Sequence, residues 1–174
     1  NIKINNNELI NWPSEPVDKP KKYSGQKIIV EYSDPNPFKP LHAGHLYTTL
    51  VGDCIARIVE YAGAEVVRIN YSGDVGLHVA KCMWGIISNI GSENFEKLEQ
   101  SVNGVKAEWL GDRYVEGSVA YESDKKAKAE IVVINKRVYE VHNNNDLTSD
   151  FARIYWKCRE WSYEYFKELY ERLG

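Results

Sequence analysis

The chain has 174 residues, of which 43% are hydrophobic and 27% are charged, a composition typical of one globular domain with enough length for a hydrophobic core. Its formal net charge of −3 argues against a protein that holds nucleic acid mainly through a basic surface, because such surfaces are usually strongly cationic. No apolar run approaches the roughly 20 residues that span a bilayer, and the polar start from Asn1 to Pro20 lacks a signal-peptide core. These features indicate a cytoplasmic protein with no membrane partner.

The three cysteines, Cys54, Cys82 and Cys158, lie far apart and form no CxxC pair. This spacing fits neither a zinc site nor a disulfide framework. We therefore expect buried free thiols and no protein-bound metal.

In chain order, residues 1–26 mix Asn, Pro, Lys and Gly with little periodicity, as in a leader or the end of a preceding domain. Lys27 to Tyr32 is a short β-branched and aromatic run, which predicts a buried strand. From Ala43 the apolar residues recur every four positions, which predicts a helix of about five turns that Gly63 closes. Those residues are Leu46, Leu50, Cys54, Ile58 and Ala62. A second strand, parallel to the first, is predicted from Glu65 to Tyr71.

The rest of the chain predicts helices, with a polar loop up to Ser101. Their expected ranges are Leu77 to Ile90, Val105 to Tyr121, Asp124 to His142 and Thr148 to Leu173. The last helix has a broad apolar stripe that must be buried against something. The stripe consists of Phe151, Ile154, Tyr155, Cys158, Trp161, Tyr165 and Leu169. The order strand, helix, strand followed by helices indicates a Rossmann-like α/β fold, which needs more parallel strands than these two.

The segment SDPNPFKPLHAGH, Ser33 to His45, lies between the first strand and the first helix. A helix N-terminus favours a polyphosphate, because it presents unpaired N–H groups and the positive end of the helix dipole. Gly44 lets a nucleotide approach the backbone closely, and His42 and His45 can donate hydrogen bonds to phosphate oxygens. Such donors would stabilise the charge that builds on an α-phosphate and on departing pyrophosphate. The segment therefore predicts ATP binding and adenylyl transfer, whereas a lone histidine is more often structural.

A longer pattern runs through the first 80 residues. It comprises VEYSDPNP at 30–37, KPLHAGHL at 39–46, Gly-Asp at 52–53, Asn70 and GDVG at 73–76. This pattern resembles arginyl-tRNA synthetase, a class I aminoacyl-tRNA synthetase. The resemblance implies a ligase that activates L-arginine with ATP and Mg²⁺ and transfers it to tRNA(Arg).

The same resemblance implies the fold and its extent. Residues 27–174 would form the first half of the catalytic domain, a truncated Rossmann-like class I synthetase nucleotide-binding fold. The helical segment at about 105–173 would be an insertion or extension of that fold.

By this resemblance, His42 to His45 is the HIGH signature that binds ATP. Glu31 and Asn36 occupy positions that contact arginine, and Ser33 and Asp34 lie beside them. A guanidinium is a planar donor fork that pairs with a carboxylate, and an amide can address an α-amino or α-carboxyl group. Asp34 stands where serine is commoner. The alternative for Glu31 is a surface strand residue.

Lys39 precedes the HIGH signature, as a lysine does in some members of the family, and could bring positive charge to the triphosphate. Its alternative is a solvated loop lysine. Tyr47 stands where arginine is common. Asp74 could line the site, but we favour a cap on the next helix.

No KMSKS-like loop and no anticodon-binding bundle is recognisable, and the first residue is not methionine. We therefore expect a piece of a longer enzyme with activity near background. It would self-associate through the segment Thr148 to Leu173 or depend on its own helices folding back. Two other functions remain open: another HIGH-motif nucleotidyltransferase, or a non-catalytic module in which that aromatic segment binds a partner.

Overall fold

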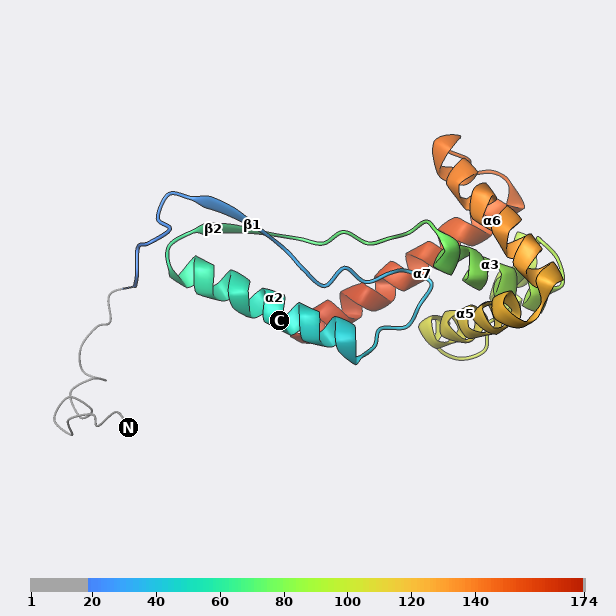
Figure 1. Ribbon diagram of the computed structural model, residues 1–174, viewed down its shortest axis with the longest axis horizontal. Helices are drawn as coiled ribbons and strands as arrows, with labels where there is room; N and C mark the ends of the chain where they lie inside the picture. Colours follow the sequence, from blue (N-terminus) through green and yellow to red (C-terminus); the bar gives the residue numbers. More distant parts are fainter. Residues whose placement is uncertain (1–18, 174) are drawn as a thin grey trace. The chain divides into compact units, whose positions relative to one another are not determined.

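The computed structural model describes residues 19–173, which divide into two compact units (Figure 1). The strand–helix unit comprises the described residues up to Tyr32 together with Thr48–Ile69. The helical unit comprises Ser33–Tyr47 and the residues from Asn70 onward. The segment that carries the HIGH signature therefore belongs to the helical unit.

The strand–helix unit contains β1 (Lys27–Glu31), β2 (Glu65–Ile69) and most of α2 (Ala43–Tyr61). The two strands pair in parallel, with Lys27 opposite Glu65 and Glu31 opposite Ile69, as the sequence predicts. Both strands are shorter than predicted. The prediction of a buried strand at β1 is wrong for this unit, because its burial alternates and the Ile29 side chain is 64% exposed.

Helix α2 runs along the strand pair (Figure 1) and presents small residues to it. Its buried residues are Thr49, Gly52 and Ala56, whereas the predicted apolar face is largely exposed. A Cβ on Gly52 would lie 2.3 Å from the Tyr32 ring, so only glycine allows this approach. The four-residue apolar repeat predicts that the large aliphatic side chains form the packing face of α2. The close contact with Tyr32 instead requires small residues on that face.

Besides Ser33–Tyr47, the described part of the helical unit contains six helical segments. They are α3 (Leu77–Ile90), the 3₁₀ turn η2 (Phe95–Lys97), α4 (Leu98–Ser101), α5 (Lys106–Ser123), α6 (Lys125–Asn143) and α7 (Asp150–Leu173). The sequence predicts α3 with the observed limits and the three long helices after it within a few residues. The predicted loop up to Ser101 is partly wrong, because it contains η2 and α4.

Two glycines bring α3 and α5 together. A Cβ on Gly85 would lie 2.2 Å from the Arg113 carbonyl oxygen, and a Cβ on Gly117 would lie 1.9 Å from the Lys81 carbonyl oxygen. Each glycine thus meets the backbone of the other helix, and any side chain would push the helices apart.

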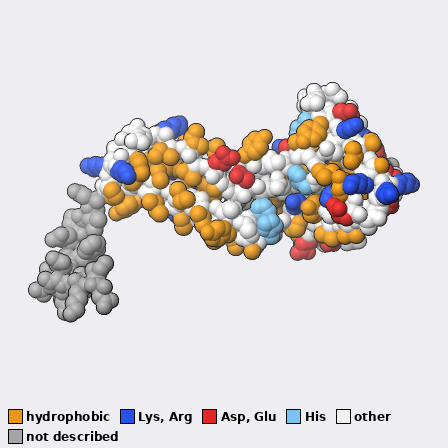
Figure 2. Space-filling model, viewed as in Figure 1, with side chains coloured by type: hydrophobic (Ala, Val, Ile, Leu, Met, Phe, Trp, Pro, Cys, Tyr) orange, Lys and Arg blue, Asp and Glu red, His pale blue; other side chains and the backbone are white. Residues whose placement is uncertain are grey.

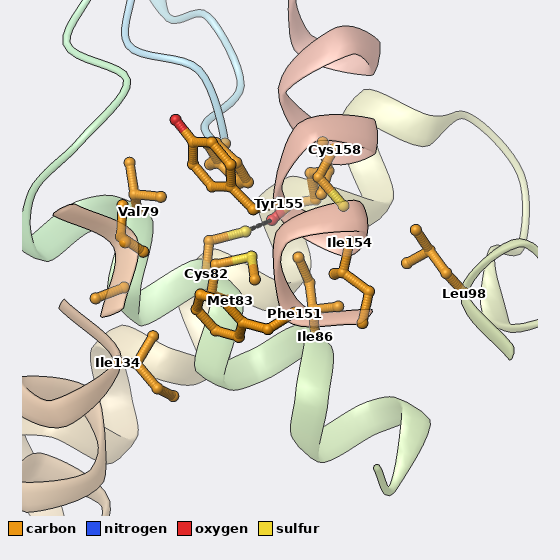
Figure 3. Close-up of a cluster of buried hydrophobic side chains, with 14 of the residues drawn as sticks. Val79, Cys82, Met83, Ile86, Leu98, Ile134, Phe151, Ile154, Tyr155 and Cys158 are labelled. Atoms are coloured by element: carbon orange, nitrogen blue, oxygen red, sulfur yellow. Dashed lines mark hydrogen bonds between the residues drawn. The ribbon is translucent and has the colours of Figure 1, made fainter. Parts of the chain in front are cut away.

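The core of the helical unit is closed by α7 (Figure 3). Phe151, Ile154 and Tyr155 are buried there beside Met83 and Ile86 of α3. Five of the seven residues in the predicted apolar stripe of the last helix are buried under the chain's own helices, whereas Tyr165 and Leu169 are only partly buried. The thiols of Cys82 and Cys158 are also buried, but the expectation is wrong for Cys54, which is exposed.

Within residues 19–173, no helix is both long enough and apolar enough to cross a membrane.

Candidate active site

The loop before α2 has an unusual backbone. Ser33, Asp34 and Phe38 all have positive φ angles, of 77°, 43° and 66°. Residues other than glycine rarely adopt this conformation, which costs on the order of 1–3 kcal/mol each unless surrounding contacts hold it. Contacts with other segments must therefore stabilise this loop.

Each of these three residues has a specific contact within the helical unit. The Ser33 Oγ lies 2.8 Å from the Tyr170 hydroxyl. The Asp34 Oδ1 accepts a hydrogen bond of 2.7 Å from the Tyr71 N–H. The Phe38 N–H donates to the Ser162 Oγ at 3.0 Å, and the Phe38 ring stacks on Tyr155 with centroids 5.4 Å apart.

The segment after β2 is fixed in the same way. The Asn70 Nδ2 donates to the Tyr170 hydroxyl at 3.0 Å, and the Asn70 Oδ1 accepts from Ser72 at 3.2 Å. The Asn36 side chain lies against Gly73, where a Cβ would come within 2.7 Å of its Oδ1. Residues 33–36 and 70–73 thus contact each other and α7.

The two histidines of the HIGH signature cap their own helix. The His42 Nδ1 accepts a hydrogen bond from the Gly44 N–H at 3.1 Å, and the His45 Nδ1 accepts one from the His42 N–H at 3.4 Å. The pair resembles a capping box made by imidazoles, except that the His42 ring accepts from the N–H of the second helical residue rather than the third. Because Nδ1 accepts in both rings, a neutral ring carries its proton on Nε2.

The electrostatics around His45 favour that neutral form. Partial burial lowers its pKa, and the nearby charges of His42 and Lys39 lower it further. Lys39 itself lies over the Tyr114 ring, with Nζ 4.9 Å from the centroid, so it is packed rather than freely solvated. A Cβ on Gly44 would lie 3.0 Å from the His42 ring, which explains the need for a small residue there.

The helical unit contains seven of the eight site residues that the sequence suggests. They are Ser33, Asp34, Asn36, Lys39, His42, Gly44 and His45. Glu31, the eighth, is the exposed last residue of β1 in the strand–helix unit.

Asp74 does not cap α3. The capping prediction is wrong, because the residue before α3 is Gly76, which makes no side-chain cap, and the Asp74 Oδ2 instead accepts from the Arg159 Nε at 2.7 Å. The Asp74 carbonyl oxygen also accepts from the Tyr155 hydroxyl at 2.8 Å.

The polar side chains of α7 that hold these loops are not predicted from the sequence. The helical pattern predicts Tyr155 only as part of an apolar stripe, and it indicates no role for Arg159, Ser162 or Tyr170. One signal was present: Ser162 is a polar residue that continues the buried face of α7, and it is only 4% exposed.

An open groove of about 490 Å³ lies beside Tyr170. Asn70, Ser72, Tyr163 and Phe166 line it with Tyr170. A second hollow, of about 440 Å³, lies between α3 and α6 and is lined by none of the suggested site residues. None of the eight suggested residues lines the first groove either, but Asn70 and Ser72 place it beside the segment after β2.

Comparison with known proteins defines the class. The sequence profile of the class I (R) tRNA synthetase catalytic domain matches residues 13–173, which places the chain among the class I tRNA synthetases. Within that class, the chain belongs to the arginyl, or (R), catalytic-domain family.

Individual relatives agree with this assignment. The chain is 32% identical to an arginine–tRNA ligase of Bdellovibrio bacteriovorus, over 87% of this chain and 25% of the relative. It is 38% identical to one of Pyrococcus abyssi, over 66% of this chain and 19% of the relative. The chain thus spans about a quarter of the length of curated relatives such as those of Bdellovibrio bacteriovorus and Treponema denticola.

The fold also has a counterpart among solved structures. An arginyl-tRNA synthetase from Plasmodium falciparum aligns with 98% of this chain and 25% of its own, with a TM-score of 0.55 and 24% identity. At that identity the likeness concerns the fold alone.

Proposed function

We propose that this chain supplies the nucleotide side and part of the arginine side of an arginyl-tRNA synthetase active site. In this proposal, β1, α2 and β2 are the start of a Rossmann-like nucleotide-binding fold. The reaction is the ATP-dependent activation of L-arginine, followed by transfer of the arginyl group to tRNA(Arg). The observation that carries the proposal is the imidazole capping box at the start of α2, in a chain of the arginyl family.

The capping box suggests how ATP is bound. When the rings of His42 and His45 turn toward the phosphates, their Nε2–H groups donate to phosphate oxygens. The Gly44 N–H, which donates to the His42 ring before ATP binds, is then free to donate to a phosphate as well. A neutral His45 suits this role, because it donates without requiring a proton from solvent. These donors stabilise the negative charge that develops on the α-phosphate and the leaving pyrophosphate. Lys39 adds positive charge near the triphosphate.

Mg²⁺ would arrive with ATP. Residues 19–173 contain no group of three or more His, Cys, Asp or Glu side chains that could hold a metal ion. Mg²⁺ commonly binds through substrate phosphates and only one or two carboxylates, so in this proposal it enters as the ATP complex.

On the arginine side, Glu31 would pair with the guanidinium and Asn36 would address the α-amino or α-carboxyl group. Ser33 and Asp34 would line the loop between them. The hydrogen bond from the Tyr71 N–H to Asp34 supports a role for Asp34 in shaping this loop beside the substrate.

Arginine-dependent charging of tRNA(Arg) by the full-length gene product tests this proposal, with ATP and magnesium. His45→Ala removes a transition-state donor and should lower the rate by about a hundredfold. Glu31→Gln should raise the KM for arginine and leave the KM for ATP nearly unchanged, because only the charge partner of the guanidinium is lost.

Matched controls lie close by. Tyr47→Phe alters an exposed residue two positions after His45, and Glu65→Gln alters an exposed glutamate of β2. Both controls should charge tRNA like the wild type. ATP turnover without arginine dependence would favour another HIGH-motif nucleotidyltransferase, and no ATP binding at all would favour a non-catalytic interaction module.

A further inference from the structure

Helix α7 holds the strained loop before α2 at two separate points. Tyr170 contacts Ser33 near the loop's start, and Ser162 contacts Phe38 near its end. Ser33 and Phe38 are themselves residues with positive φ. Because such backbone conformations persist only where surrounding contacts hold them, these hydrogen bonds determine the loop's geometry.

Tyr170 differs from Ser162 because it joins two loops. Its hydroxyl accepts from the Asn70 Nδ2 at 3.0 Å and lies 2.8 Å from the Ser33 Oγ. Since one lone pair takes the Asn70 proton, the hydroxyl proton can be donated to Ser33. The segments that follow β1 and β2 are thus cross-linked through one oxygen atom.

The cross-link is neutral and placed next to an open volume. Burial is the main cause that raises the Tyr170 pKa above its usual value, so the hydroxyl keeps its proton at physiological pH. The Tyr170 ring also lines the groove of about 490 Å³, which is large enough for a small ligand.

We infer that Tyr170 is a positioning residue for the amino-acid substrate: its hydroxyl fixes Ser33 and Asn70, and thereby the loop that carries Asp34 and Asn36. This inference rests on the proposed function, in which that loop meets arginine. Ser162 serves the other end of the loop, at Phe38, which directly precedes Lys39 and the HIGH signature. One helix therefore supports the arginine side and the nucleotide side through different hydrogen bonds.

The test compares three variants of the full-length gene product. Tyr170→Phe removes only the bridging hydroxyl and should raise the KM for arginine about tenfold, the effect of losing one or two neutral hydrogen bonds, with the KM for ATP within about twofold of wild type. Ser162→Ala should show the opposite selectivity: it should raise mainly the KM for ATP and leave the KM for arginine nearly unchanged. Tyr165→Phe is the control, because within residues 19–173 the Tyr165 hydroxyl makes no hydrogen bond and its ring packs beside Phe166.

The outcomes separate the two proposals. A wild type that charges no arginine would refute the proposed function itself. An active wild type with an unchanged arginine KM in Tyr170→Phe would refute only the positioning role. Equal losses for arginine and ATP in both α7 variants, together with a lower melting temperature, would also refute it, because they would indicate a general structural contact.

Discussion

The two units of this chain bury different kinds of side chain. Among the residues of the strand–helix unit that the structure describes, the buried ones are small: Thr49, Gly52, Ala56, Ala62 and Ala64. In the helical unit the core contains large side chains, including Phe38, Met83, Tyr155 and Trp161. Figure 2 shows the corresponding surface, with apolar side chains gathered over the α2 region. Because burial of apolar area is the main driving force of folding, the helical unit holds most of the chain's stability.

This difference matters for the site, since the HIGH segment belongs to the helical unit. The loop residues with positive φ are held by α7 and by the segment after β2. A strained loop persists only where surrounding contacts hold it in place. The well-packed helical unit therefore keeps the loop before α2 rigid. The sequence alone suggests only a simple junction between a strand and a helix.

The largest expected difference between the units is in thiol reactivity. Cys54 of the strand–helix unit is exposed, whereas Cys82 and Cys158 are buried and burial raises the pKa of both thiols. Since the thiolate is the reactive form, the buried pair should react with a disulfide reagent on the order of a thousandfold more slowly, after the core opens. The measurement is the time course of labelling at pH 8. Cys54→Ser should abolish the fast phase, and a second fast thiol in that variant would contradict the burial of the helical core.

A smaller difference is expected for one pair of substitutions. Ile86→Ala empties space in the helical core, where Ile86 is 0% exposed, and should lower the free energy of unfolding by about 3 kcal/mol. Ile58→Ala, at a position 67% exposed on α2, should change it by less than about 0.5 kcal/mol, because alanine favours helix and little packing is lost. Urea unfolding followed by circular dichroism gives both values. Equal losses would mean that the outer face of α2 is covered.

The smallest expected effect is a pH dependence of the helical unit. The folded-state pKa values of Cys82 and Cys158 are raised. The contribution of the two buried thiols to the free energy of unfolding is therefore fully present below the pKa of an unfolded thiol, near 8.5, and is lost as the pH rises above that value. Each thiol that stays protonated in the fold should lower stability by roughly 1 kcal/mol per pH unit above that point. Unfolding midpoints at pH 7, 8.5 and 9.5 measure this slope. Cys158→Ala should reduce it, and a stability that increases over this range would contradict the burial of the thiols.

Several elements could be predicted because their signals are local. The limits of α3 follow from an apolar repeat that ends at Gly91, whose left-handed conformation closes the helix. The parallel pairing of β1 and β2 follows from the intervening helix. The face of α2 could not be predicted in this way, because the Tyr32 ring selects small residues and no periodicity reveals that neighbour.

The family pattern, the order of the elements and the place of the HIGH histidines at a helix start can all be predicted from the sequence, because they depend on residues close together in the chain. The contacts that hold that site come from the tertiary fold. Tyr170 reaches Ser33 across 137 positions, and Arg159 reaches Asp74 across 85. Hydrogen bonds between residues so far apart depend on the packing of α7 in the core, and an amphipathic pattern specifies which residues are buried but not which hydroxyl or guanidinium meets which loop.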